Sequence, residues 1–143
     1  MQLPLITPES VHRAENYIQQ HLTENIRLDD IVSAAGVPAR TLHYGFKRFR
    51  SSTPMRLLRQ KRFEQARQDL LAGARDGVQV MHVAHRYWMH HGGRFAINYQ
   101  KQFGETPSAT LRSALKQSAE LAQAGSTSSL STFLQPLGST APR

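Results

Sequence analysis

The chain has no cysteine among its 143 residues. Disulfide bridges and thiolate metal sites are therefore excluded, and the absence fits a reducing compartment. The sequence also lacks an apolar run of 18 residues and an N-terminal basic region followed by an apolar stretch. It therefore predicts neither a membrane span nor a signal peptide. No stretch alternates apolar and polar residues as a half-buried strand does, so the expected fold class is all-α.

Patterns that carry catalysis are missing as well. There is no nucleophile beside a base, no glycine-rich phosphate loop and no pair of acids, so the sequence predicts a protein that is not an enzyme and needs no cofactor. Four of the seven histidines lie close together, but no cysteine or acid lies nearby to complete a metal site. We interpret these four as surface residues without a metal. They are His82, His85, His90 and His91.

The net charge of +8 is concentrated in one part of the chain. Between Arg40 and Arg67 there are nine Lys or Arg residues and a single acid, Glu64, so this segment alone carries a charge equal to that of the whole chain. A concentrated basic face indicates a polyanionic partner, most often nucleic acid. The alternative is a solvated helix face that only keeps the protein soluble.

A long helix is predicted at the centre, from Thr53 to Ala72. Thr53 can cap its N-terminus, and Pro54 suits the first helical position because a backbone N–H has no partner there. Nothing breaks the helix before Gly73, so it should hold about 19 residues and be roughly 28 Å long. Its apolar residues share one stripe, and its basic residues mostly lie off that stripe. The stripe comprises Met55, Leu58, Phe63, Ala66, Leu70 and Leu71.

Six shorter helices are predicted by apolar periodicity, capping signals and glycine stops. They span residues 8–23, 28–35, 38–50, 79–87, 91–103 and 107–121. We expect residues 1–7 to be a disordered lead-in and residues 8–121 to be one domain. From residue 122 to residue 143 the composition turns to Gly, Ser, Thr and Pro, which predicts a flexible tail.

The two halves of the chain repeat one pattern. Each half has a short helix, a tight turn, a longer helix and then a Thr-Pro pair, at Thr53-Pro54 and at Thr106-Pro107. This is the helix-turn-helix pattern, in which the first helix braces the second and the second presents its outer face to the major groove of DNA. Two such units, joined by a helix nearly as long as one DNA turn of about 34 Å, are much stronger evidence than one.

Several motifs occur in register over about residues 10–113. They are Ala35-Gly36-Val37, Arg40-Thr41-Leu42, Thr53-Pro54-Met55, Gly93-Arg94-Phe95 and, most specifically, Phe103-Gly104-Glu105-Thr106-Pro107-Ser108 followed by Thr110-Leu111-Arg112. With these motifs the sequence resembles the DNA-binding domain of AraC/XylS-type transcriptional regulators. The resemblance implies seven helices, with two helix-turn-helix units bridged by a long helix. It also implies a regulator, expected to be an activator, that binds double-stranded promoter DNA.

The resemblance carries expectations about partners too. Such regulators commonly contact RNA polymerase, and they typically carry a sensor and dimerisation domain before the DNA-binding domain. Only about seven residues precede the first predicted helix, so we expect the sensor domain to be absent from this chain. We expect a bacterial cytoplasmic protein that associates with the nucleoid and has no membrane partner.

The second unit departs from the family pattern at its turn. The family usually has Gly then Phe there, whereas this chain has Trp88-Met89. Tryptophan does not adopt a positive φ without cost, so we expect this turn to be rearranged or strained. Gly92 stands at the start of the second recognition helix, and we expect that helix to be loose or to start late.

Residues that contact DNA are expected on the outer faces of helices 38–50 and 91–103, opposite their apolar residues. In the first of these helices, Arg40, His43 and Tyr44 match the family's base-contacting positions, and Lys47 and Arg48 are expected to contact phosphates. The candidates in the second helix are His91, Arg94 and Ile97 for bases, and Asn98 and Lys101 for phosphates.

Other functions stay open on the sequence alone. The chain could bind RNA or another polyanion without sequence specificity, or it could be a basic helical module that binds an acidic protein partner. The basic helix could also bind a membrane surface, although its apolar stripe fits a protein core better. Specific binding to duplex DNA should survive salt and excess random duplex far better than non-specific binding.

Overall fold

The computed structural model describes the backbone of residues 8–140 and the side chains of residues 8–124. Every regular element in this part of the chain is helical, which confirms the all-α prediction. The predicted lead-in, residues 1–7, lies outside the described residues. The elements are α1 (Pro8–Gln20), α2 (Leu28–Ala35), α3 (Ala39–Arg50), α4 (Pro54–Gly73), the short 3₁₀ helix η1 (Ala74–Asp76), α5 (Val80–Arg86), α6 (Gly92–Phe103) and α7 (Pro107–Thr140).

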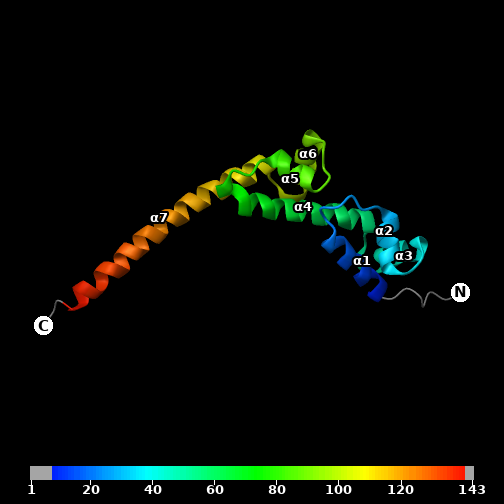
Figure 1. Cartoon of the computed structure of the whole chain (residues 1–143), viewed down its shortest axis with the longest axis horizontal. Coiled ribbons are helices and arrows are strands. Elements are labelled where there is room, and N and C mark those ends of the chain that lie inside the picture. The colour runs from blue at the N-terminus through cyan, green and yellow to red at the C-terminus, as the bar shows by residue number, and fades with distance from the viewer. Residues whose placement is uncertain (1–7, 141–143) are drawn as a thin grey trace.

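Helix α4 lies at the centre of the molecule (Figure 1). The helices α1, α2 and α3 pack on one another and on one end of α4, and α5, α6 and the start of α7 pack around its other end. We call α1–α3 the first unit and α5–α7 the second unit. A single cluster of buried apolar side chains runs through both units and α4. The predicted arrangement of two helix-turn-helix units joined by a long helix is confirmed.

The predicted start of α4 is present in detail. The Thr53 side chain accepts a hydrogen bond of 3.1 Å from the backbone N–H of Arg56, and Pro54 occupies the first helical position. Leu58 and Phe63 face the core, but Met55 is 41% exposed. Met55 differs from the prediction because it lies in the first turn, at the edge of the buried stripe. Leu71, at the other end of the stripe, is also partly exposed.

The turn of the first unit is formed by Gly36. Its φ is 75°, in the left-handed region that glycine enters without a steric cost, and its N–H bonds to the carbonyl oxygen of Val32. The guanidinium of Arg13 donates to the carbonyl oxygen of Ala35 at 2.8 and 3.0 Å. The C-terminal end of α2 is therefore satisfied by both a backbone and a side-chain donor.

The turn of the second unit was predicted to be either rearranged or strained, and the structure shows that it is strained. Trp88 has φ 65°, a left-handed conformation that costs a non-glycine residue roughly 1–2 kcal/mol. The expected late start of the following helix is wrong, because α6 begins at Gly92. A Cβ at Gly92 would lie 3.0 Å from Sδ of Met81, so glycine allows α5 and α6 to approach closely.

Two helix ends differ from the predicted boundaries. Helix α1 ends at Gln20 rather than near residue 23, because the chain turns there through a bond from the N–H of His21 to the carbonyl oxygen of Ile18. Helix α7 continues to Thr140, well past the predicted end at Leu121. Serine and threonine lower helix propensity by only a few tenths of a kcal/mol, so their abundance does not force a helix to stop. Flexibility of residues 122–143 stays a prediction.

Candidate nucleic-acid interface

Helix α3 presents a polar face opposite its buried face. Leu42 and Phe46 are buried in the core. On the other side, Arg40, Tyr44, Lys47 and Arg48 are exposed, and His43 is half-buried. The structure therefore brings all five predicted contact residues of α3 to its outer side.

Local contacts orient two of these side chains. Nδ1 of His43 lies 3.0 Å from the carbonyl oxygen of Ala39, which can only accept, so the neutral ring carries its proton on Nδ1 and leaves Nε2 as an acceptor. The guanidinium of Arg48 lies over the ring of Phe49, with Cζ 5.7 Å from the ring centre. Neither contact occupies the whole polar group, so both side chains keep hydrogen-bonding capacity for a partner.

An ion pair fixes α3 against α1. Arg50, at the end of α3, donates through Nη2 to Glu15 of α1 at 3.0 Å and through Nε at 2.5 Å. The hydrogen bonds from Arg50 hold the pKa of the Glu15 carboxyl below its ordinary value. One of the nine basic residues of the central segment is thus engaged in an ion pair within the chain.

Helix α6 presents the corresponding face in the second unit. Phe95 and Tyr99 are buried, whereas His91, Arg94, Ile97 and Lys101 are exposed and Asn98 is half-buried. Ile97 is 58% exposed, which is unusual for a large apolar side chain and suits contact with a thymine methyl group. His91 occupies the N-cap position but makes no capping hydrogen bond, so its ring is not used to start the helix.

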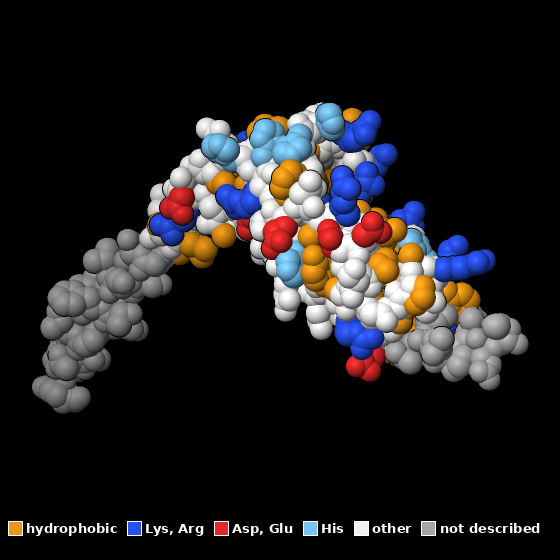
Figure 2. All heavy atoms as spheres, turned by 45° about the vertical axis from the view of Figure 1, so that its right-hand side comes forward, with side chains coloured by type: hydrophobic (Ala, Val, Ile, Leu, Met, Phe, Trp, Pro, Cys, Tyr) orange, Lys and Arg blue, Asp and Glu red, His pale blue; other side chains and the backbone are white. Residues whose placement is uncertain are grey.

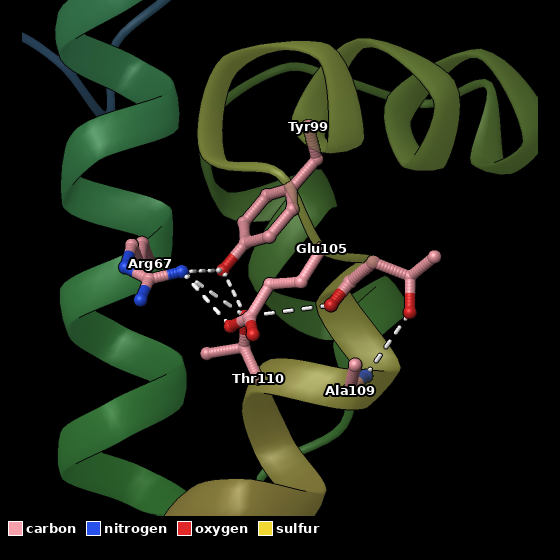
Figure 3. Close-up of polar contacts among 6 residues, drawn as sticks. Arg67, Tyr99, Glu105, Ala109 and Thr110 are labelled. Atoms are coloured by element: carbon pink, nitrogen blue, oxygen red, sulfur yellow. Dashed lines mark hydrogen bonds and ion pairs between the residues drawn. The ribbon is translucent and has the colours of Figure 1, made fainter.

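A partly buried polar network holds α6 against α4 and α7 (Figure 3). Nη1 of Arg67 lies 3.4 Å from the hydroxyl of Tyr99, 3.1 Å from Oε2 of Glu105 and 3.2 Å from Oγ1 of Thr110. The Tyr99 and Thr110 hydroxyls are 2.7 Å apart, and Thr110 also donates to Glu105. The bond from Thr110, followed by the bond and charge of Arg67, keeps the pKa of Glu105 below its ordinary value.

This network changes the interpretation of Arg67. Its sequence position predicted a place in the basic face, whereas in the structure its guanidinium bonds to Tyr99, Glu105 and Thr110. Arg62 is likewise internal: it donates to the carbonyl oxygens of Leu22 at 3.0 Å and Glu24 at 2.6 Å, and burial lowers its pKa. The hydroxyl of Tyr99 on an otherwise apolar helix face was a sequence signal for the Arg67 contacts, whereas the Arg62 contacts go to backbone oxygens and have no such signal.

A hollow of about 480 Å³ lies between the first half of α4, the turn after α5 and the first half of α6. Of the described residues that line it, none is acidic. We call it the central hollow. Its walls include Arg56, Arg59 and Arg62 of α4 and Trp88, His91 and Arg94 of the second unit.

Trp88 joins the two units directly. Its indole Nε1 donates a hydrogen bond of 2.9 Å to the carbonyl oxygen of Thr23, in the loop between α1 and α2. Its ring also meets the ring of His90 edge to face, with centres 5.7 Å apart. The strained turn therefore presents a donor to the first unit, 65 residues away in the sequence.

The histidines of the second unit lie at the surface over α5 and the turn that follows it, and Figure 2 shows them beside Lys and Arg side chains. His85 and His90 meet edge to face at 4.9 Å. Within the described part of the chain, no group of three or more His, Cys, Asp or Glu residues is placed to hold a metal ion. None of the described helices combines the length and apolar character needed to cross a membrane.

Comparisons with known proteins match this geometry. Residues 31–113 match the family model described as "Helix-turn-helix domain". The chain is 35% identical over 105 residues to the probable thc operon regulatory protein of Rhodococcus erythropolis. The aligned residues make up 73% of this chain and 32% of that protein. It is 33% identical over 108 residues to the XylDLEGF operon transcriptional activator of Pseudomonas putida, covering 76% of this chain and 34% of that protein.

A solved structure shares the fold. It belongs to a probable AraC family transcriptional regulator from Rhodopseudomonas palustris, with a TM-score of 0.67 and 28% identity, covering 73% of this chain and 96% of that one. The chain spans about a third of the length of the two curated relatives above. The similarity therefore concerns one region of those longer proteins.

Proposed function

The chain belongs to the AraC/XylS family of helix-turn-helix transcriptional regulators, and we propose that it binds double-stranded promoter DNA with sequence specificity to activate transcription. The observation that carries the proposal is the pair of outward polar faces on α3 and α6, held at the two ends of one helix. Helix α4 has 20 residues and hence a length of about 30 Å, close to one turn of DNA at about 34 Å. Two recognition helices so spaced suit adjacent major-groove segments.

Within this function, the contact residues divide by chemistry. Arg40 can pair with both acceptors of a guanine edge, and Nε2 of neutral His43 can accept from the amino group of adenine or cytosine. Tyr44 completes the base-reading set of α3, while Lys47 and Arg48 bind phosphates. In α6, the base-reading residues are His91, Arg94 and Ile97, and the phosphate-binding residues are Asn98 and Lys101.

The proposal extends to cellular partners. Several relatives are named as operon activators, and an activator acts on the transcription machinery, so we include contact with RNA polymerase and association with the nucleoid. Non-specific RNA binding or an acidic protein partner accounts less well for two separate polar faces with similar architecture. Those functions need a basic surface, but they need no spacing close to one DNA turn.

Selection of bound sites from a random duplex library tests the proposal. The expected result is enrichment of two short motifs whose centres lie about 10–10.5 base pairs apart. The enriched duplex should also outcompete random duplex as salt is raised, because base contacts add to the phosphate term. Failure to enrich any motif, with equal binding to RNA and random duplex, would favour the non-specific alternative.

A further inference from the structure

Three arginines of the central hollow have no internal role. The side chains of Arg56, Arg59 and Arg94 are exposed, and within the described residues none of them makes a hydrogen bond or an ion pair. Their neighbours on α4 differ, since Arg62 and Arg67 are bound by internal oxygen atoms. The guanidinium groups of Arg56 and Arg59, beside that of Arg94, make this acid-free hollow suitable for an anion with several oxygen atoms.

Nearby carboxylates do not neutralise this site. Oε1 of Glu64 on α4 lies 3.6 Å from Nζ of Lys61, and this carboxylate also accepts a hydrogen bond from Gln60. The carboxylate of Asp69 accepts hydrogen bonds from Arg86 and Tyr87. Neither acid lines the central hollow. The positive charge of the three arginines therefore faces outward, toward a ligand.

The position of the hollow relates it to both recognition helices. Arg94 and the nearby Asn98 lie one turn apart on α6, whose outer face we assign to DNA. Arg56 and Arg59 lie in the first two turns of α4, which begins four residues after the end of α3. A DNA strand that borders both the groove segment occupied by α6 and the groove segment occupied by α3 must cross the surface between these elements.

We propose that the central hollow seats the backbone phosphates of this crossing strand, with Arg56 and Arg59 as phosphate ligands beside Arg94. The proposal rests on the proposed function, because it takes DNA as the ligand, and it adds two ligands from α4. Arginine binds phosphate oxygens in pairs through its planar fork. Contacts of this kind fix the position of the protein on the duplex without reading sequence.

Trp88 supplies a direct probe of the site. It is the single tryptophan of the chain, it lines the central hollow, and it is 43% exposed. A phosphate backbone seated in the hollow changes the solvent exposure and the electric field around its indole. The intrinsic fluorescence of the wild-type protein should therefore change when duplex DNA spans both recognition helices.

The variant Arg56→Gln/Arg59→Gln tests the two ligands, with Arg75→Gln as the matched control. Arg75 lies on η1 at the far end of α4, is exposed, and is not part of the hollow. Removing two phosphate contacts should lower the slope of log affinity against log salt by about 1.8, while the motif selected from the library stays the same. The control should change the slope by less than half as much. Circular dichroism verifies that each variant is folded.

Neutral methylphosphonates in the DNA provide a second arm that leaves the protein unchanged. Placed between the two selected motifs, they should weaken binding of the wild type several-fold and the double variant hardly at all. Two results would contradict phosphate binding in the central hollow and leave the proposed function standing. One is equal weakening of both proteins by the methylphosphonates. The other is an unchanged salt slope in the double variant while the wild type still binds DNA. If the wild type selects no motif, the proposed function is wrong, and the proposed phosphate binding in the central hollow is wrong with it.

Discussion

At the scale of single residues, Arg40 and Lys47 share the exposed face of α3 but should act differently. Arg40→Ala should weaken binding to the selected duplex by about 1–3 kcal/mol and relax the base preference at one position of the motif, because a base contact is lost.

Lys47→Ala should weaken binding to selected and random duplex alike and reduce the slope of log affinity against log salt by about 1, because a phosphate contact is lost. Titrations of both duplexes at several salt concentrations measure these effects. An equal loss on both duplexes for Arg40→Ala would contradict base reading.

Thr110 is a buried residue whose hydroxyl links three side chains. It is fully buried and bonds to Arg67, Tyr99 and Glu105. Thr110→Val keeps the shape but removes one hydrogen-bond partner each from Tyr99, Glu105 and Arg67, so the free energy of unfolding should fall by about 1–3 kcal/mol. Thr110→Ser, which retains the hydroxyl, should lose clearly less. Chemical denaturation of the two variants measures the difference, and equal losses would assign the effect to the methyl group instead.

Glu105 should make stability depend on pH in the acid range. Its pKa in the folded protein lies below the ordinary value of 4.5, because Thr110 and Arg67 bind the carboxylate. Its contribution is therefore present above about pH 4.5 and is lost as pH falls through the folded pKa. Denaturation between pH 3 and pH 7 should show a weaker pH dependence in Glu105→Gln than in the wild type.

At the scale of elements, the turn after α5 links the two units. Trp88→Phe keeps an aromatic ring but removes the N–H that donates to Thr23. The units should then reorient more freely around α4, so affinity for a duplex with both motifs should fall several-fold while affinity for a duplex with one motif stays the same. Fluorescence anisotropy with labelled duplexes of both kinds measures this. A parallel loss on both duplexes would indicate damage to α6 rather than loss of the link.

Local signals explain which elements could be predicted from the sequence. The Gly36 turn, the Thr53-Pro54 start of α4 and the Gly104 stop of α6 depend on residues adjacent in the chain, and the structure contains all three. The outer faces of α3 and α6 followed from helical periodicity in the same way. The predicted roles of their individual residues in DNA contact stay predictions.

Contacts between distant residues could not be predicted in this way. The bond from Trp88 to Thr23 spans 65 residues, and the network around Arg67 spans up to 43. A strained residue is tolerated only where the surrounding structure stabilises it, and that structure is not visible in a local pattern. The unpaired arginines of the central hollow were hidden for the same reason, because Arg56, Arg59, Arg62 and Arg67 look alike in the sequence.

At the scale of the whole molecule, the distribution of charge differs from its simple count. The segment from Arg40 to Arg67 holds nine basic residues, but Arg50, Arg62 and Arg67 are engaged by internal partners and Lys61 lies near Glu64. The cations left for a polyanion lie on α3, in the first half of α4 and on α6. In the proposed binding mode, these are the cations that would contact the duplex.

The central claim is that α3 and α6 contact one duplex at the same time, at a separation that α4 fixes. Inserting 5 base pairs between the two selected motifs tests it most directly, because the second motif then faces the opposite side of the DNA. Affinity should fall to that of a duplex with a single motif. Unchanged affinity after the insertion would contradict the claim and would mean that the two helices do not bind the duplex together.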